Sequence, residues 1–154
     1  MTGPPVFALL PTDQLRIHEE VEPQDVARLV EEIRRDGFVA EPIWVARGSH
    51  VVLNGHHRCA ALRALGARLT PAWVFDYDSE EVVLGRWADG PPISKREVVE
   101  RAVAGRPFPP KTTRHRLLPA LPERRTPLAE LGVPAAQLRS VVPPPATRRS
   151  GDGP

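Results

Sequence analysis

The chain has 154 residues, of which 41% are apolar and 26% charged, and its formal net charge is +2 at pH 7. This length predicts one modest core with a tail, because a second domain would have too few residues left for a core of its own. The lone Cys59 excludes an intrachain disulfide and a zinc site built from cysteines, which is typical of a reducing compartment.

Two features of the sequence bear on its location. No apolar run approaches the roughly 20 residues that are needed to cross a bilayer. The first residues, MTGPPVFALLP, lack the basic start and the small-residue cleavage site of a signal peptide. We therefore expect a cytoplasmic protein that has no membrane partner.

Charge and proline are unevenly distributed. Residues 106–154 carry 9 Lys/Arg against 3 Asp/Glu and hold 11 of the 19 prolines, whereas residues 1–76 carry 8 Lys/Arg against 10 Asp/Glu. Proline breaks helices and central strands, so part of the C-terminal third should be extended or disordered. Such a basic segment could contact DNA, but it has almost no aromatic residues for stacking on bases, which favours a solvated end.

The first half of the chain predicts alternating helices and strands. In residues 22–37, apolar side chains recur at the spacing of one helical face, with Pro23 in the first turn and Gly37 as a left-handed stop. Two β-branched runs at 41–46 and 50–54 predict a hairpin. A helix over 56–65, closed by Gly66, and a strand over 70–77 follow.

The second half is less regular. Residues 80–87 predict a further strand, and the next helix has a capping box, with Ser94 as N-cap, Glu97 three residues later and Gly105 at its end. A short helix is expected to begin at Thr126 and Pro127. From Ser140 onward we expect no fixed structure.

The stretch NGHHR, residues 54–58, begins the second predicted helix with three nitrogen-rich side chains. A helix start offers about four unpaired backbone N–H groups and the positive end of the helix dipole, and Gly55 lets a ligand approach the backbone closely. Arg58 is disfavoured there by roughly 0.3–1 kcal/mol, a cost that a bound phosphate would remove. The stretch therefore indicates an anion site.

Two other interpretations of this stretch stay open. A metal site would require His56 and His57 to converge on one ion, yet adjacent helical residues diverge by about 100°. Alternatively, one histidine caps the helix or packs in the core, and Arg58 forms a surface ion pair.

Two further polar clusters favour the functional interpretation. Upstream, His18 and Glu19 precede the first helix, where a carboxylate can serve as a general base or hold a metal-bound nucleotide. Downstream, the sequence KTTRH, residues 111–115, combines phosphate donors with small hydroxyl groups. We expect the three clusters to meet in one cleft.

The order of these motifs resembles the ParB/sulfiredoxin superfamily over residues 9–77, and again over residues 106–118. Within the superfamily, the chain is most similar to the free serine kinases, which share the His-Glu loop and the later KTTRH sequence. The resemblance implies an α+β fold with a small mixed β-sheet and packed helices. It also implies that the phosphates of a nucleotide lie over the Gly-X-X-Arg turn.

The resemblance implies roles for the matched positions. Glu19 would be the catalytic base that takes the proton from the acceptor hydroxyl, with His57 as a second catalytic residue. Nucleotide and phosphate would contact Gly55, His56, His57, Arg58, Lys111, Thr112 and Arg114. The acceptor pocket would be formed by Asn54, Trp87, Thr113 and His115, although a core position is an equally good interpretation of Trp87.

The same resemblance implies ATP or ADP as the phosphate donor and Mg²⁺ as the cofactor that bridges its phosphates, with no side chain assigned as a metal ligand. The acceptor would be free L-serine or a similar amino acid. The nucleotide-binding domain would span residues 1–118, followed by a Pro/Arg-rich extension, partly disordered, over residues 119–154.

Asn54 departs from the family, whose kinases commonly read Asp-Gly-His-His-Arg at this place. Asn can neither accept a proton nor supply a full negative charge to Mg²⁺. Asn54 could still orient the acceptor while Glu19 transfers the proton, the acceptor could differ from serine, or nucleotide could bind without turnover. Phosphoryl transfer depends chiefly on positioning and charge, so one missing carboxylate does not exclude activity.

Two other functions are alternatives to the kinase. A ParB-like nucleotide-binding module could regulate a partner or associate with DNA, but 13 prolines in residues 78–154 leave no convincing helix-turn-helix. A resemblance to the sulfiredoxins would require a Gly-Cys-His-Arg turn whose cysteine attacks the substrate, whereas His56 stands at the position of that cysteine. Cys59 is therefore expected to be a small core residue.

Overall fold

The centre of the fold is a four-stranded mixed sheet in the order β1-β5-β3-β4. The computed structural model describes residues 4–118 and 120–139, so the tail expected from Ser140 lies outside the described residues. In the sheet, β3 pairs with β4 in an antiparallel and with β5 in a parallel arrangement, and β5 pairs with β1 in an antiparallel one. The strands are β1 (Val6–Pro11), β3 (Ile43–Ala46), β4 (Val52–Asn54) and β5 (Leu69–Phe75). The predicted hairpin and the α+β class are confirmed.

Strand β1 was not predicted. It pairs with β5 along its whole length, from Val6 opposite Val74 to Pro11 opposite Leu69. Its apolar residues do not alternate with polar ones, and prolines stand on both sides, so the stretch carries no period-2 signal. Because β1 is an edge strand, the missing N–H of Pro11 is tolerated.

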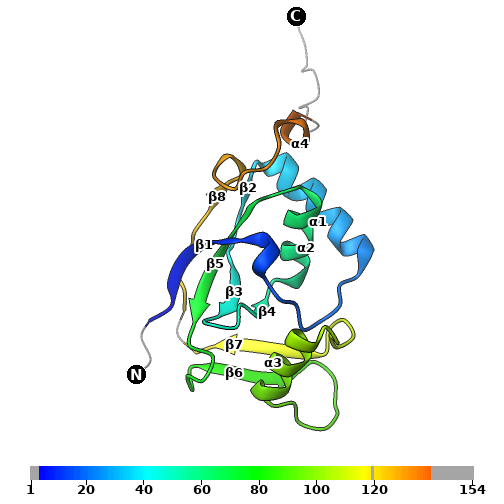
Figure 1. Cartoon of the computed structure of the whole chain (residues 1–154), viewed down its shortest axis with the longest axis vertical. Helices are drawn as coiled ribbons and strands as arrows, with labels where there is room; N and C mark the ends of the chain where they lie inside the picture. The colour runs from blue at the N-terminus through cyan, green and yellow to red at the C-terminus, as the bar shows by residue number, and fades with distance from the viewer. Residues whose placement is uncertain (1–3, 119, 140–154) are drawn as a thin grey trace, which may run out of the picture.

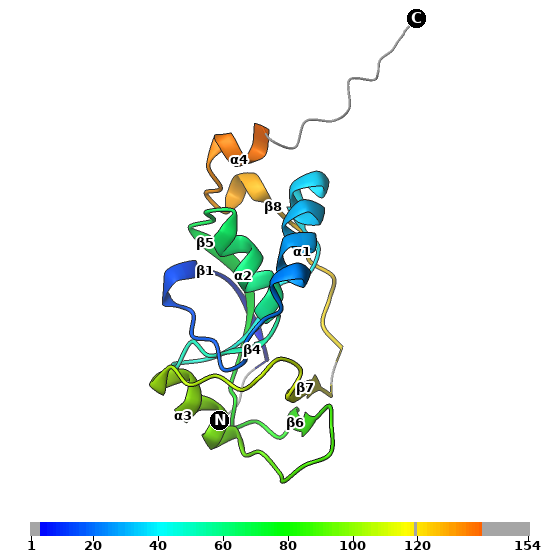
Figure 2. The same ribbon diagram turned by 90° about the vertical axis from the view of Figure 1, so that its right-hand side faces the viewer.

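Helices α1 (Pro23–Asp36) and α2 (His56–Ala64) lie beside each other against the sheet (Figures 1 and 2). Both were predicted within one residue of their observed bounds. Helix α1 ends at Gly37, whose φ of 80° requires the left-handed region. Between the helices, Ile33 packs with Leu62 and Leu65 in one buried cluster. Each fully buried side chain of this kind contributes about 1.5–3 kcal/mol relative to an exposed one.

The C-terminal described segment completes this cluster. Strand β8 (Thr126–Pro127) pairs with β2 (Phe38–Val39), the 3-10 helix η2 (Leu128–Glu130) follows, and α4 (Ala135–Arg139) is the last element. The prediction of a helix beginning at Thr126 is therefore wrong, because Thr126 pairs with Val39 before the chain turns. Leu128 and Leu131 pack against α1 and α2. The domain boundary after residue 118 stays a prediction, but residues 126–133 share the core of the preceding domain.

A second structural unit lies at the end of the molecule away from α4 (Figure 2). It consists of the antiparallel pair β6 (Val82–Arg86) and β7 (Thr113–Leu117) together with α3 (Lys95–Ala104). The predicted cap of α3 is confirmed, since the Ser94 hydroxyl accepts a hydrogen bond from Glu97 N–H at 3.0 Å. In β7, Thr113 and His115 are buried while Arg114 and Arg116 are exposed. This alternation turns two polar side chains toward the interior.

The 3-10 helix η1 (Thr12–Gln14) connects β1 to the loop that carries His18 and Glu19. That loop is tied to the segment before β7 by backbone hydrogen bonds, from Phe108 N–H to His18 C=O and from Glu20 N–H to Phe108 C=O, both at 2.8 Å. Two regions about ninety residues apart in the sequence are thereby held side by side. Within the described residues, no helix has the length and hydropathy of a membrane span.

Candidate functional site

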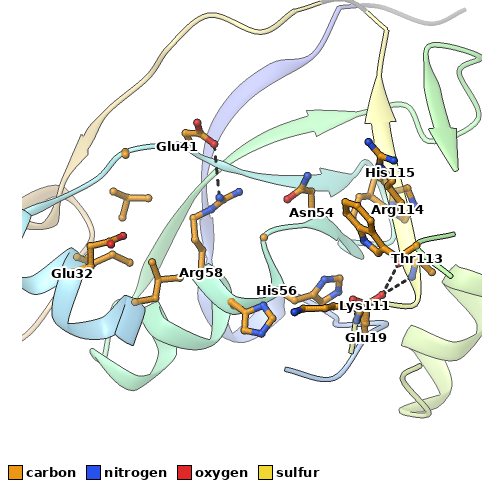
Figure 3. A pocket seen from close by; sticks show the side chains of 18 of the residues that line it. Glu19, Glu32, Glu41, Asn54, His56, Arg58, Lys111, Thr113, Arg114 and His115 are labelled. Atoms are coloured by element: carbon orange, nitrogen blue, oxygen red, sulfur yellow. Dashed lines mark hydrogen bonds and ion pairs between the residues drawn. The ribbon is translucent and has the colours of Figure 1, made fainter. Parts of the chain in front are cut away.

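A cavity of about 690 Å³ lies between the α1–α2 pair and the β6–β7 unit (Figure 3). Its volume falls within the range of small-molecule sites. All three polar clusters predicted from the sequence contribute to its wall: Glu19, the turn from Asn54 to Arg58, and the β7 segment that includes Thr113. The remaining predicted residues in the wall are Trp87, Lys111, Arg114 and His115.

The start of α2 forms the floor at the middle of the cavity. Gly55 precedes the helix with φ 97°, and no side chain caps the helix N-terminus. A Cβ on Gly55 would lie 2.7 Å from Cγ2 of Ile43 and 2.8 Å from Nη2 of Arg58. Glycine is therefore needed twice, for the left-handed backbone and for space. The first N–H groups of α2 remain available to an anion.

Arg58 lies in the cavity wall with a side chain that is only 23% exposed. Its Nη2 donates to Pro42 C=O at 3.3 Å, its Nη1 lies 3.9 Å from Oε1 of the exposed Glu41, and its Nε has no hydrogen-bond partner. Burial lowers the pKa of Arg58, and the Glu41 charge only partly opposes this. A largely buried cation with an unpaired N–H and a distant counter-ion favours an anionic ligand.

The two adjacent histidines of the turn point in different directions. His56 is buried, and its Nε2 accepts a hydrogen bond from His18 N–H at 3.3 Å. The Nε2 of His57 instead accepts from Glu22 N–H at 3.1 Å and so caps the start of α1. His56 therefore faces the interior, whereas His57 links the two helices at the cavity wall. The interpretation in which one histidine packs in the core fits His56, but its second part, a surface ion pair of Arg58, does not hold, because the Arg58 side chain is largely buried and lies 3.9 Å from Glu41.

The Glu19 carboxylate is held by the segment that leads into β7 (Figure 3). Its Oε2 accepts from Lys111 N–H at 2.9 Å, and its Oε1 accepts from both N–H and Oγ1 of Thr113, at 2.8 and 2.7 Å. A carboxylate oxygen has two lone-pair sites, so Oε2 keeps one site for a further donor. Glu19 is thus fixed in place with proton-accepting capacity left.

The late KTTRH motif serves several purposes. Lys111 adopts the left-handed region with φ 59°, an uncommon conformation for a residue other than glycine that aims its N–H at Glu19. Arg114 lies over the ring of Trp87, with 4.5 Å between Cζ and the ring centroid. Thr112 does not line the cavity, and its hydroxyl donates to Pro109 C=O at 2.7 Å. Thr112 therefore lacks the placement expected of a phosphate ligand.

Trp87 is 60% exposed, so its interpretation as a core residue is wrong. It follows β6 and reaches the cavity wall, where Arg114 covers one face of its ring. Asn54, at the end of β4, lies between Arg58 and His115 in the same wall (Figure 3). Both residues are placed where a small polar acceptor could be contacted.

Three buried histidines form a cluster at this wall, and two of them, His56 and His115, line the cavity. The His18 ring is 4.4 Å from the His56 ring and 5.4 Å from the His115 ring, measured between centroids. Burial is the main cause that lowers the pKa of all three, to about 3 for His115 and well below 6.5 for His56. For His18 the charge of Glu19 opposes the lowering. The three rings are therefore neutral near pH 7.

Some wall residues were not predicted from the sequence. Leu29 and Ile33 of α1 contribute apolar side chains, together with Phe38, Val39 and Ala40, and the acidic residues Glu32, Asp36 and Glu41 lie nearby. The spacing of its apolar residues predicts that this face of α1 packs in the core. The sequence does not distinguish the core residues of this face from those that border a cavity. His18 was singled out only as the neighbour of Glu19.

In the part of the chain that the structure describes, no group of three or more His, Cys, Asp or Glu residues could hold a metal ion. Cys59 is fully buried in the core, as expected, and burial raises the pKa of its thiol. A buried thiol with a raised pKa does not support the sulfiredoxin type of chemistry.

The chain is similar in sequence to an L-serine kinase and to a ParB-like protein. Over 83 residues it is 40% identical to an ATP-dependent L-serine kinase of Staphylothermus marinus, a match that spans 51% of this chain and 33% of that protein. Over 74 residues it is 43% identical to a ParB-like protein of Sulfolobus acidocaldarius, spanning 48% of this chain and 37% of that protein. The chain thus matches about a third of the length of these curated relatives. No protein-family model matches it.

Solved structures extend the likeness to nearly the whole described chain. A free serine kinase in complex with AMP superposes with a TM-score of 0.71 at 19% identity, covering 85% of this chain and 95% of that one. The chain has the free serine kinase fold. The resemblance read from the sequence motifs is confirmed by these relatives and by this fold.

Proposed function

We propose that the chain is a nucleotide-dependent kinase that phosphorylates the hydroxyl of free L-serine or a similar amino acid. The observation that supports the proposal is that Glu19, Gly55 and Arg58 line one cavity. Glu19 is held at one end by Lys111 and Thr113, and the uncapped start of α2 with the partly unpaired Arg58 lies at the middle. Similarity to L-serine kinases supports the same activity.

The lining of the cavity suggests an orientation for the nucleotide. The apolar side chains of Leu29, Ile33 and Phe38 line the same cavity and suit a base. Glu32, which is on α1 with Leu29 and Ile33, lies on the far side of Arg58 from Glu19 (Figure 3). The phosphates would then lie over the Gly55 turn, with Arg58 as a charge-assisted donor. The terminal phosphoryl group would point toward Glu19 and the acceptor.

The transfer step follows from this orientation. The acceptor hydroxyl oxygen attacks the terminal phosphorus of ATP or ADP, and the bond from that phosphorus to the bridging oxygen breaks. The shortened nucleotide leaves with the bond electrons, and Glu19 Oε2 takes the hydroxyl proton. The α2 N–H groups and Arg58 stabilise the phosphoryl charge in the transition state.

The acceptor would occupy the end of the cavity formed by Asn54, Trp87 and His115. Asn54 can donate to or accept from an amino acid through its amide. Lys111, with its ammonium 3.7 Å from Glu22, and Arg114 supply positive charge for a substrate carboxylate or a phosphate. Neither Arg114 nor Trp87 is buried, so both can adjust to the substrate.

Magnesium would arrive with the nucleotide. Mg²⁺ in nucleotide sites is typically bound by phosphate oxygens, waters and only one or two carboxylates, which suits a wall without a cluster of metal ligands. When bound, the ion would neutralise phosphate charge. The residues described above would still orient both substrates and hold the proton at Glu19.

The test of the proposal is direct. The purified protein is incubated with ATP or ADP, Mg²⁺ and a panel of hydroxyl amino acids, and phosphorus NMR is used to detect a phosphoamino acid. We expect O-phosphoserine or a close analogue. Tight nucleotide binding without any phosphoamino acid would contradict the kinase and favour the nucleotide-binding module suggested by the ParB-like relative.

The variant Asn54→Asp identifies the acceptor class. A rise in serine phosphorylation would mean that Asn54 has moved the native specificity away from serine. A fall would mean that the Asn54 amide itself serves the native acceptor. Salt-sensitive DNA binding by the inactive protein would instead support the DNA-associated module.

A further inference from the structure

Two acceptors beneath the cavity compete for one hydroxyl proton. Oγ1 of Thr113 lies 2.7 Å from Oε1 of Glu19 and 2.8 Å from Nε2 of His18. A threonine hydroxyl has a single proton, so it can donate to only one of them at a time. Which of the two receives this proton depends on the protonation of the His18 ring.

The other ring nitrogen of His18 settles its tautomer. Nδ1 lies 2.7 Å from Val52 C=O, and a carbonyl oxygen can only accept, so Nδ1 carries a proton. Burial lowers the pKa of His18 against the opposing charge of Glu19, so the ring is neutral near pH 7. Its Nε2 is then a bare acceptor aimed at Thr113. When Glu19 is ionised, Nε2 of His18 and Oε1 of Glu19 are two acceptors that share the single proton of the Thr113 hydroxyl.

We propose that His18 is a positioning residue for the base: its Nε2 draws the Thr113 hydroxyl proton away from Glu19 and so keeps the Glu19 carboxylate a stronger proton acceptor. This inference rests on the proposed kinase function. A carboxylate loses basicity with every hydrogen bond that it accepts, and Glu19 has three such contacts. The competition weakens one of the three.

The competition for the Thr113 hydroxyl ends when Glu19 takes the proton of the substrate hydroxyl. The neutral carboxyl group no longer needs the hydroxyl as a donor, so Thr113 donates to His18 without opposition. Proton uptake at Glu19 therefore relieves an unsatisfied acceptor in the interior, which favours the step that the kinase requires. Nothing else is consumed, since the proton comes from the acceptor hydroxyl.

Neighbouring titratable groups do not supply the missing proton. His56 faces His18 from α2, but its Nε2 accepts from His18 N–H. His115 faces it from β7, and its Nε2 forms a 2.6 Å hydrogen bond with the Tyr77 hydroxyl. Burial raises the pKa of Tyr77 and lowers that of His115, so the phenol keeps its proton and the imidazole stays neutral.

Nearby cations are also committed elsewhere. Lys95 donates to Tyr77 C=O at 2.8 Å and to Ser79 C=O at 2.9 Å. The Lys111 ammonium lies 3.7 Å from a carboxylate oxygen of Glu22. Lys111 contacts Glu19 through its backbone N–H. Thr113 is therefore the side-chain link between His18 and Glu19.

The test compares variants that remove the Nε2 acceptor of His18 or the hydroxyl of Thr113. His18→Asn keeps a donor near the place of Nδ1 but removes Nε2, and His18→Gln is its control because its amide oxygen can reach the place of Nε2. Thr113→Val removes the hydroxyl and keeps the backbone N–H to Glu19, and Thr113→Ser restores the hydroxyl. The readout is the acid limb of the pH profile of kcat, with KM measured separately.

The expected shifts have opposite signs. Without Nε2 the Thr113 hydroxyl donates to Glu19 alone, so the acid limb of the kcat profile of His18→Asn should shift to lower pH by about one unit. In Thr113→Val it should move up, while His18→Gln and Thr113→Ser should lie near the wild-type limb. The double variant should match Thr113→Val, because His18 acts only through the hydroxyl. An unshifted limb in His18→Asn, or the same downward shift in the Thr113→Val background, would overturn the inference.

Two NMR measurements keep the test independent of turnover and of variant stability. Nitrogen shifts of the wild-type His18 ring should show a neutral Nδ1–H tautomer at about pH 7, and an imidazolium would overturn the inference. The carbon-detected titration midpoint of the Glu19 carboxyl should follow the same order as the kinetic limbs. A wild type without any phosphoryl transfer contradicts the kinase, whereas the NMR results decide the role of His18 in either case.

Discussion

Glu19 and Thr113 are 94 positions apart in the chain, yet Thr113 donates to the Glu19 carboxylate from its backbone N–H at 2.8 Å and from its hydroxyl at 2.7 Å. The contact joins the loop before α1 to the first residue of β7. It thereby fixes a carboxylate at one end of a cavity whose middle is the start of α2. Positioning of this kind is what phosphoryl transfer requires of a protein.

Replacing Glu19 by Gln should lower kcat by roughly 10²–10⁴-fold, the usual contribution of a general base, with little change in nucleotide affinity. The amide cannot take up the acceptor proton. Glu20→Gln is the matched control, since Glu20 is exposed and does not line the cavity. Steady-state kinetics and calorimetric titration with nucleotide measure both quantities. An unchanged kcat in Glu19→Gln would remove Glu19 from the mechanism.

Replacing Arg58 by Ala should weaken nucleotide binding by about 10- to 150-fold, because a charge-assisted contact of roughly 1.5–3 kcal/mol is lost. Arg63→Ala is the control. Arg63 is on the same helix but donates to Leu15 C=O at 2.8 Å and does not line the cavity. Isothermal titration of both variants checks the prediction. Equal affinity of Arg58→Ala and wild type would argue against a phosphate at this place.

Replacing Gly55 by Ala should destabilise the fold and the anion site together. The new Cβ would meet Ile43 and Arg58 at under 3 Å, in a backbone conformation that costs roughly 1–2 kcal/mol for a residue other than glycine. Overpacking adds about 1–3 kcal/mol. Gly105→Ala separates the two costs, because Gly105 has φ 69° and no atom within 4 Å of its Cβ position. Chemical denaturation should give the larger loss for Gly55→Ala, and equal losses would rule out the close approach.

Acid should weaken the fold through the buried histidines. Burial lowers the pKa of His115 from 6.5 to about 3 and that of His56 well below 6.5. Between the folded and unfolded pKa values the unfolded chain binds more protons, so stability rises with pH in that interval. The free energy of unfolding should thus fall as the pH drops below 6.5, by about 1.4 kcal/mol per pH unit for each such histidine.

Denaturation curves between about pH 7 and pH 5 measure this slope, since carboxylates contribute little there. In the variant His115→Gln the slope should fall by the contribution of about one proton, and the glutamine amide can still form a hydrogen bond with the Tyr77 hydroxyl. Unfolding free energies that do not depend on pH in this interval would contradict the assignment of neutral buried rings.

The sequence predicted the elements that have strong local signals. Helix α1 has a regular apolar face between Pro23 and Gly37, and the α3 cap needs only Ser94 and Glu97, so both could be placed without tertiary information. Strand β1 depends on pairing with β5, and Thr126 pairs with Val39 instead of beginning a helix. These two elements are set by contacts across the chain, which a local pattern does not contain.

The residues of the candidate site also fall into two groups, those that have a local sequence signal and those that do not. The turn around Gly55 and the Glu19 loop could be found because their residue types carry chemistry at short spacing. The apolar wall of α1 and the link between His18 and Thr113 could not be found, because they depend on how distant segments pack. In β7 a signal was present, since Thr113 and His115 alternate with two arginines, but polar residues on the inner face conceal the strand.

We propose that the start of α2 holds the phosphates of a nucleotide next to Glu19. A crystal structure of the protein with ADP and serine tests it most directly. We expect phosphate oxygens within hydrogen-bond distance of the first N–H groups of α2 and of the Arg58 guanidinium, with the serine hydroxyl at Glu19. Nucleotide bound elsewhere, with no phosphate at the α2 start, would contradict the claim.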